Sequence, residues 1–126
     1  MNFAFQVANL AALVTLGLGL MALARPDIAA RLVSVLPQGS MGKSEIRGTY
    51  GGLFFAMGLV TLISQNHRMF GLLAAAWLGA AGGRLFSLWS DSNRELRNVG
   101  GIAFEAALGL LLLLPTLVVW WRNLFG

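Results

Sequence analysis

Residues 99–121 are VGGIAFEAALGLLLLLPTLVVWW, an apolar run whose only charged member is Glu105. A helix of about 20 residues crosses the ~30 Å hydrocarbon layer of a bilayer. The run is too long for one strand, and it does not alternate polar with apolar positions as a membrane barrel would. It therefore predicts a membrane-spanning helix, and it indicates that the chain lies in a lipid membrane.

Three further segments share this character. They are residues 3–24 without a charge, residues 46–64 charged only at Arg47, and residues 69–89 charged only at Arg84. Short connections force neighbouring helices to run antiparallel. We therefore predict an all-α, integral membrane four-helix bundle that forms a single transmembrane domain over residues 1–126. Its helices should cover about residues 3–24, 45–64, 69–90 and 95–121.

The composition supports a membrane protein and excludes several kinds of site. Hydrophobic residues make up 57% of the 126 residues and charged residues only 11%, whereas a soluble domain carries about 25% charged residues. A chain this short cannot bury so much apolar surface in a water-soluble core. The absence of cysteine excludes disulfides, thiolate metal sites and iron–sulfur clusters. His67 is the only histidine, so we predict no metal site and interpret His67 as a solvated loop residue.

The first apolar segment has one feature of a signal peptide, because Ala22-Leu23-Ala24 resembles a cleavage site. The preceding Met1-Asn2 carries no Lys or Arg, and the apolar run is longer than a usual signal core. We interpret the segment as a retained helix.

The connection between the first two spans has a helical pattern of its own. Pro26 suits a first helical turn, and Ile28, Leu32 and Leu36 recur at helical spacing. We predict a short helix over residues 27–36 lying in the membrane interface, ended by Pro37 and followed by a flexible connection over residues 38–42. In the last connection, Ser92 and Glu95 have the spacing of a capping box.

The basic residues are divided unequally between the two sides of the predicted bundle. One side carries Arg25, Arg31, Lys43, Arg94 and Arg97, with Arg47 at its edge, and the other carries Arg68 and Arg122. The positive-inside rule places the richer side in the cytoplasm. We therefore expect a multi-pass protein with both termini on the periplasmic side. Trp120 and Trp121 should form an interfacial anchor at the outer surface.

Arg84 and Glu105 are the charges deepest in the predicted spans. At 1.5 Å per residue from the turn near Asp91, Arg84 lies roughly 11 Å deep and Glu105 roughly 20 Å. Helical side chains lean toward their own N-terminus, so on antiparallel helices these two converge. We predict a buried Arg84–Glu105 ion pair. It either sets the register of the bundle or forms a site for a ligand head group or a proton, because intramembrane charges are candidates for function.

The start of the second span adds polar residues at the same inner surface. Arg47 can snorkel to the lipid headgroups, while Tyr50 is one turn deeper. We therefore expect an inner polar pocket of Arg47, Tyr50, Arg84 and Glu105. Small residues let membrane helices approach closely. The glycines expected to serve helix packing are Gly48, Gly52, Gly79, Gly83, Gly101 and Gly109.

Three stretches together resemble a known family. They are SEIRGTYGG at residues 44–52, LGAAGGRLFSL at residues 78–88, and Glu105 in the last span. The chain resembles a bacterial family of small four-helix membrane proteins described as domain of unknown function 4345, and distantly resembles proteins of the DoxX and DoxD type in layout. The resemblance implies a bacterial inner-membrane location. It marks Glu45, Arg47, Tyr50, Arg84, Asp91 and Glu105 as the positions of interest.

Four functions remain open at this stage. The leading expectation is an accessory or scaffolding subunit of a membrane complex, or a homo-oligomer, because the loops are short and the glycine faces can dock other helices. The first alternative is a lipid- or quinone-binding protein that uses the inner Arg/Tyr/Glu pocket. A small proton-coupled carrier built on Glu105 comes third, and an autonomous enzyme last, since no catalytic residues are apparent. We expect the bilayer and other subunits or self-copies as partners, no nucleic acid, and no cofactor beyond such a quinone or lipid.

Overall fold

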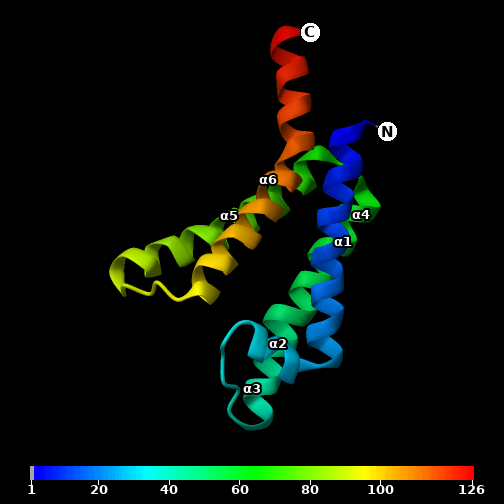
Figure 1. The fold of residues 1–126 in the computed structure, drawn as a ribbon. Coiled ribbons are helices and arrows are strands. Elements are labelled where there is room, and N and C mark those ends of the chain that lie inside the picture. The colour runs from blue at the N-terminus through cyan, green and yellow to red at the C-terminus, as the bar shows by residue number, and fades with distance from the viewer. Residues whose placement is uncertain (1) are drawn as a thin grey trace. The chain divides into compact units, whose positions relative to one another are not determined.

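The computed structural model describes residues 2–126, and this part of the chain is all-α, without β-strands. Seven helical elements follow one another in these residues (Figure 1). They are α1 (Phe3–Ala24), α2 (Pro26–Leu32), α3 (Gly39–Ile46), the π-helix η1 (Arg47–Gly52), α4 (Leu53–Ser64), α5 (His67–Ser90) and α6 (Leu96–Phe125).

Among the described residues, four helical stretches are long and apolar enough to cross a membrane. They are α1, the continuous stretch Gly39–Ser64 that combines α3, η1 and α4, then α5, and α6. Large apolar side chains are exposed on all four, for example Leu10, Ile63, Leu72 and Leu110. Such surfaces need lipid around them. The chain is a small multi-pass membrane protein.

The described chain divides into two compact units. The first contains residues 2–11 and 65–126, and the second contains residues 12–64. The single transmembrane domain expected over residues 1–126 stays a prediction.

In the second unit, glycines bring α1 and α4 into backbone contact. A Cβ at Gly58 would lie 2.8 Å from the backbone nitrogen of Leu16 and 3.0 Å from the carbonyl oxygen of Ala12. A Cβ at Gly19 would likewise overlap the backbone nitrogen of Phe55. Membrane helices associate through such close contacts, because lipid provides no hydrophobic force between them.

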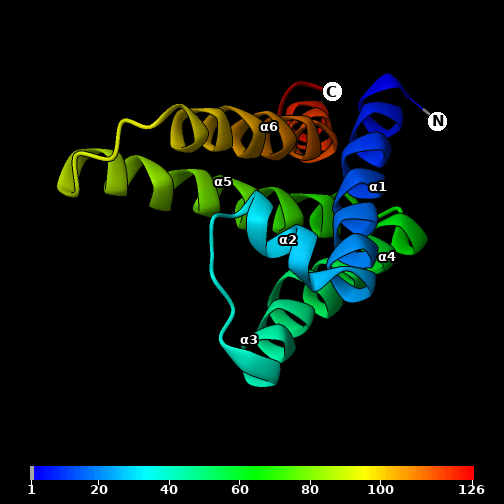
Figure 2. The same cartoon turned by 60° about the horizontal axis from the view of Figure 1, so that its bottom comes forward.

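A small apolar cluster packs α1, α2 and α3 together in this unit. Its buried members are Ala22, Ala29, Ala30 and Ile46, and Met21 and Tyr50 pack against them. The cluster fixes α2 against the end of α1 and the end of α3. Figure 2 shows α2 and α3 joined by an extended connection.

The helix between the first two spans is shorter than the predicted range of 27–36. It ends at Leu32, because Ser34 adopts a left-handed conformation with φ of 57°. The amide of Val35 then donates to the carbonyl of Ala30 over 2.9 Å, which closes the helix end. Pro37 is therefore not the residue that stops this helix.

Asp27, in the first turn of α2, lies between two arginines. Asp27 is 3.6 Å from Arg25 Nε and 3.7 Å from Arg31 Nη2. Desolvation raises the pKa of the Asp27 carboxyl, but the two guanidinium groups outweigh it and hold this pKa below its usual value.

The second span begins earlier than predicted. Residues 38–42 were expected to be flexible, yet helix α3 begins at Gly39, so this prediction is wrong. The amide of Gly42 donates to the carbonyl of Gln38 over 2.9 Å. A Cβ at residue 42 would lie 2.9 Å from the backbone of Pro37, so the glycine lets the chain fold back on Pro37. The π-helical geometry of η1 was also not predicted.

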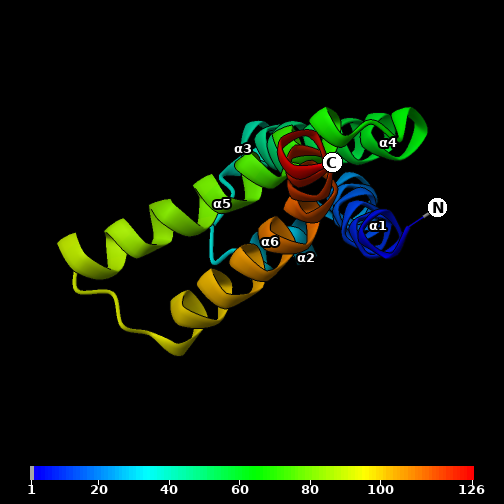
Figure 3. The same ribbon diagram turned by 90° about the horizontal axis from the view of Figure 1, so that it is seen from above.

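In the first unit, α5 and α6 run antiparallel and side by side (Figures 1 and 3). Thr116 Oγ1 donates to the carbonyl of His67 over 2.6 Å near the start of α5. Trp77 and Phe104 form an edge-to-face pair with ring centroids 6.1 Å apart. Gly109 faces Leu78, where a Cβ would lie 2.6 Å from Leu78 Cγ. These contacts fix the register of the two helices.

The start of α1 also belongs to this unit. Phe5 and Phe70 form an edge-to-face pair at 5.6 Å. The side-chain amides of Asn9 and Gln65 bond each other in both directions, over 3.2 and 2.7 Å. Two reciprocal amide bonds satisfy polar groups that would otherwise face hydrocarbon.

Helix α6 differs from the prediction at both ends. The expected capping box is absent, because Ser92 is left-handed with φ of 52° and Glu95 caps α6 without a side-chain hydrogen bond. The helix continues past residue 121 to Phe125, whose ring lies 4.3 Å from that of Trp121. Pro115 lies inside α6, and the helix changes direction along its length in Figure 1. A proline removes one helical hydrogen bond and bends the helix.

Candidate functional site: a charge pair within the spans

Arg84 of α5 and Glu105 of α6 form the ion pair expected from the sequence. Arg84 Nε donates to Glu105 Oε1 over 2.9 Å. The Glu105 side chain is 11% exposed and that of Arg84 is 32% exposed. Among the described residues, this is the one ion pair inside the spans, so charge is balanced locally.

Two neighbours on α6 position the Arg84 side chain and backbone. A Cβ at Gly101 would lie 2.9 Å from both Cζ and Nε of Arg84, so the guanidinium lies directly over this glycine. Buried Asn98 donates through Nδ2 to the carbonyl of Asn93 over 3.0 Å, with a longer 3.5 Å contact to the carbonyl of Arg84. These contacts link the start of α6 to the preceding turn at Asn93 and to the backbone of α5 at Arg84.

The pair is incomplete in its hydrogen bonding. Glu105 Oε2 is buried without a hydrogen-bond partner among the described residues. Arg84 uses only Nε toward Glu105, so its two Nη groups have no side-chain acceptor in the described part of the chain. A bidentate arginine–carboxylate pair would have satisfied both carboxylate oxygens. An ion pair that served packing alone would gain from that closed geometry.

The small residues of α5 near Arg84 lie on more than one face of the helix. Gly79, Gly82 and Gly83 are exposed, and a Cβ at any of them would meet no atom within 4 Å. At about 3.6 residues per turn, this glycine strip lies on a different face from Arg84.

The Arg84 side chain lies over Gly101 of α6. Exposed Ala76 and Ala80 precede Arg84 at successive i, i+4 positions, so they lie in the same row of α5 as Arg84.

Asp91 lies apart from the ion pair in its bonding. It caps α5, where it accepts hydrogen bonds from Ser87 Oγ over 2.8 Å and from Ser90 Oγ over 3.0 Å. A carboxylate at a helix C-terminus is disfavoured by the helix dipole, and the two hydroxyls offset this effect. The contacts of Asp91 account for it as a helix-terminating residue.

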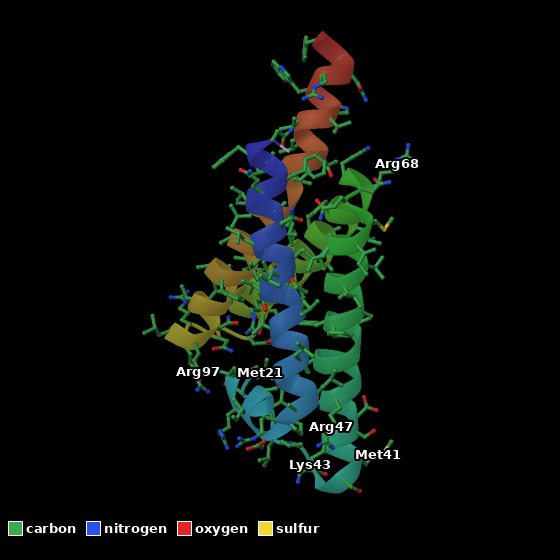
Figure 4. All side chains as sticks on the ribbon, turned by 90° about the vertical axis from the view of Figure 1, so that its right-hand side faces the viewer. Met21, Met41, Lys43, Arg47, Arg68 and Arg97 are labelled. Atoms are coloured by element: carbon green, nitrogen blue, oxygen red, sulfur yellow. The ribbon has the colours of Figure 1, made fainter. Side chains whose placement is uncertain are left out.

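The remaining expected polar residues belong to the second unit. Arg47 Nε donates to the carbonyl of Leu23 over 3.1 Å, near the end of α1. Tyr50 packs edge-to-face on Phe54 at 5.9 Å, and Glu45 is exposed on α3. Figure 4 shows Lys43 and Arg47 at the same end of this unit. The pocket expected to combine Arg47 and Tyr50 with Arg84 and Glu105 stays a prediction.

The six glycines expected to pack helices have different surroundings. Gly101 and Gly109 approach side chains of α5. Gly48, Gly79 and Gly83 have open space where a Cβ would be, and Gly52 lies near its own helix. The closest approaches to the backbone of another helix are instead made at Gly19 and Gly58.

The sequence did not predict that Asn98 is buried or that Gly101 lies beneath the Arg84 guanidinium. Asn98 is only 5% exposed, although it precedes an apolar span as an ordinary loop residue would. A polar residue in the first turn of a membrane helix is a usable signal, because a buried amide needs partners.

His67 Nδ1 is also buried without a hydrogen-bond partner in the described residues. No group of three or more potential metal ligands occurs in that part of the chain.

No curated protein and no solved structure matches the chain. Residues 6–116 match a protein family, and this matched range includes the π-helical segment, Arg84 and Glu105. Since this match covers most of the sequence, the chain belongs to the family described as a domain of unknown function (DUF4345).

Proposed function

We propose that this protein binds a lipid-soluble molecule within the bilayer and that Arg84 holds the polar head of that molecule. The observation that carries the proposal is the one-sided ion pair, in which Glu105 engages Nε and leaves both Nη groups of Arg84 without a side-chain acceptor among the described residues. A guanidinium has five N–H donors, and donors in hydrocarbon require acceptors.

Energetics favour an occupant over an empty site. A buried polar group without a partner costs about 1–3 kcal/mol. A ligand that brings acceptor atoms to the Nη groups removes that cost for Arg84. Exposed Ala76 and Ala80, in the same i, i+4 row as Arg84, leave room for an apolar tail to lie against α5. This combination of one polar anchor and an apolar helix face is typical of sites for amphiphiles.

The proposed location is a bacterial inner membrane, with Arg84 in the cytoplasmic leaflet. The unequal division of Arg and Lys between the two sides supports this orientation. A lipid or a quinone is the kind of small molecule available at that depth.

The test is the ligand content of protein purified in nanodiscs formed directly from the membrane. Lipid-soluble molecules are extracted and quantified by mass spectrometry for the wild type, Arg84→Gln and the matched control Arg68→Gln. We expect one molecule enriched over the bulk lipid in the wild type and the control, and reduced at least tenfold in Arg84→Gln. Identical lipid content in all three proteins would contradict the proposal.

A second candidate is a subunit of a membrane complex or of a homo-oligomer. The open space at Gly79, Gly82 and Gly83 favours it, because exposed small residues on a membrane helix let another helix approach. In this arrangement a helix of a neighbouring subunit covers the glycine strip on α5.

Cross-linking distinguishes the two candidates. Because the chain has no cysteine, Gly79→Cys introduces a single thiol on the glycine strip, and Leu85→Cys gives a matched thiol on a different exposed face of α5. A subunit role predicts disulfide-linked dimers or captured partners through residue 79 but not through residue 85. A monodisperse monomer with no cross-link at either position would exclude this candidate.

A further inference from the structure

We infer that the molecule held by Arg84 is an uncharged amphiphile whose head carries oxygen acceptors, such as an ester or ketone carbonyl, and that anionic heads are disfavoured. This inference rests on the proposed function and specifies the chemical class of the ligand. The charge balance of the site carries it, together with the depth of Arg84 and the atoms it leaves free.

The first argument is charge. Arg84 is already neutralised by Glu105, whose Oε1 lies 2.9 Å from Nε. An anionic head at the Nη groups would give the site a net charge of about −1 in a low-dielectric region, where an unbalanced charge is costly. A neutral carbonyl accepts the same N–H groups and leaves the net charge at zero.

The second argument is the direction of the free donors. Glu105 occupies the Nε side of the guanidinium, so the planar pair of Nη groups presents only hydrogen-bond donors. The complementary group must therefore accept. Glu105 Oε2 also has no hydrogen-bond partner among the described residues, but this oxygen is buried and so is not accessible to a ligand head. Carbonyl oxygens have two lone pairs each and meet that requirement without any proton transfer.

The third argument is depth. Arg84 precedes Asp91, the C-cap of α5, by seven residues, which corresponds to roughly 10 Å of helix. A phosphate or sulfate head drawn to that depth would leave its hydration behind, at a cost of several kcal/mol. An ester or ketone loses far less hydration, so it can lie beside Arg84 with its chain along the exposed Ala76 and Ala80.

The experiment uses three probes that share an 18-carbon chain and differ at the head. Methyl oleate is a neutral acceptor, oleyl sulfate is permanently anionic, and 1-octadecene has no acceptor. Equal trace amounts are added to full-length protein in phosphatidylcholine nanodiscs, and the bound fraction of each probe is measured by native mass spectrometry. The proteins are the wild type, Arg84→Gln, Glu105→Gln and the control Arg68→Gln.

We expect the wild type and Arg68→Gln to retain methyl oleate at least tenfold over both other probes. Arg84→Gln should retain methyl oleate no better than 1-octadecene. Glu105→Gln removes the neutralising carboxylate, so its retention of oleyl sulfate should rise about tenfold over the wild type. If Glu105→Gln does not fold, the ranking of the probes on the wild type decides alone.

Two results would overturn the inference in different ways. If the wild type retains oleyl sulfate over methyl oleate and Arg84→Gln abolishes this preference, the ligand class is wrong while the proposed binding function stands. If no probe exceeds 1-octadecene in the wild type and natural ligand content is also independent of Arg84, both the inference and the proposed function fail.

Discussion

At the scale of single residues, the informative feature is a charge pair that is bonded on one side only. The sequence predicted that Arg84 and Glu105 meet, because antiparallel helices lean their side chains toward each other. It could not predict that Nε rather than the Nη groups would make the contact, since that depends on the guanidinium lying over Gly101. The same limit applies to Asn98, whose burial depends on the turn before α6.

Removing the Glu105 charge should destabilise the protein less than removing the whole side chain. Glu105→Gln keeps an acceptor for Arg84 Nε, whereas Glu105→Ala leaves a partly buried cation without its partner. We expect Glu105→Ala to lose about 1–3 kcal/mol more than Glu105→Gln, as measured by thermal unfolding in nanodiscs. Glu95→Gln, in the exposed turn, is the control and should be neutral. Equal losses for the two Glu105 variants would mean that the acceptor kept by glutamine contributes no stability.

Asn98 should support the site through the backbone. Its amide donates to the carbonyl of Asn93 at 3.0 Å and lies 3.5 Å from that of Arg84. Asn98→Leu removes both contacts, so we expect a loss of about 1–3 kcal/mol in unfolding free energy and weaker retention of methyl oleate. Thermal unfolding and native mass spectrometry measure the two effects. A variant as stable as the wild type would exclude this role.

At the scale of helices, the residues that decide contacts are small ones. The sequence predicted that glycines serve packing, but the pattern could not distinguish a glycine that faces a helix from one that faces lipid. Gly58 and Gly19 contact backbone, whereas Gly17 has open space. The end of α2 and the start of α3 could not be predicted for a related reason. Ser34 and Gly42 act there through local backbone geometry, which the hydrophobic pattern does not show.

Enlarging Gly58 should separate α1 from α4. A Cβ there would lie 2.8 Å from the backbone nitrogen of Leu16, which cannot move without shifting the helix. We expect Gly58→Leu to cost at least about 1–3 kcal/mol, the usual range for overpacking, and to lower the yield of folded protein. Gly17→Leu, on the open face of α1, is the matched control. Similar unfolding temperatures for the two variants would contradict the observed packing.

At the scale of the whole molecule, composition and the apolar runs were sufficient to predict an all-α membrane protein. Four helical stretches of the described chain are long enough to span, as expected. Hydrophobic pattern carries this information because every backbone group in lipid must be bonded within its own helix. The division into two compact units could not be predicted, since it depends on which helix faces touch.

The absence of cysteine makes the orientation directly measurable. In the proposed orientation, we expect Ser40→Cys and Ser92→Cys to react with a membrane-impermeant maleimide only after the membrane is permeabilised. Gly126→Cys should react in intact spheroplasts, because one crossing, α6, separates it from the basic turn at residue 92. Labelling of residues 40 and 92 in intact spheroplasts would reverse the proposed orientation and place Arg84 in the outer leaflet.

The central claim, that Arg84 anchors a lipid-soluble ligand, is tested most directly by photo-cross-linking. The probe is the methyl ester of an 18-carbon fatty acid with a diazirine in its chain, added to protein in nanodiscs and mapped by peptide mass spectrometry. We predict cross-links concentrated in residues 76–88 of α5 in the wild type and in Arg68→Gln, and lost from this segment in Arg84→Gln. Cross-links spread evenly over the lipid-facing residues of all spans, and unchanged by Arg84→Gln, would contradict the claim.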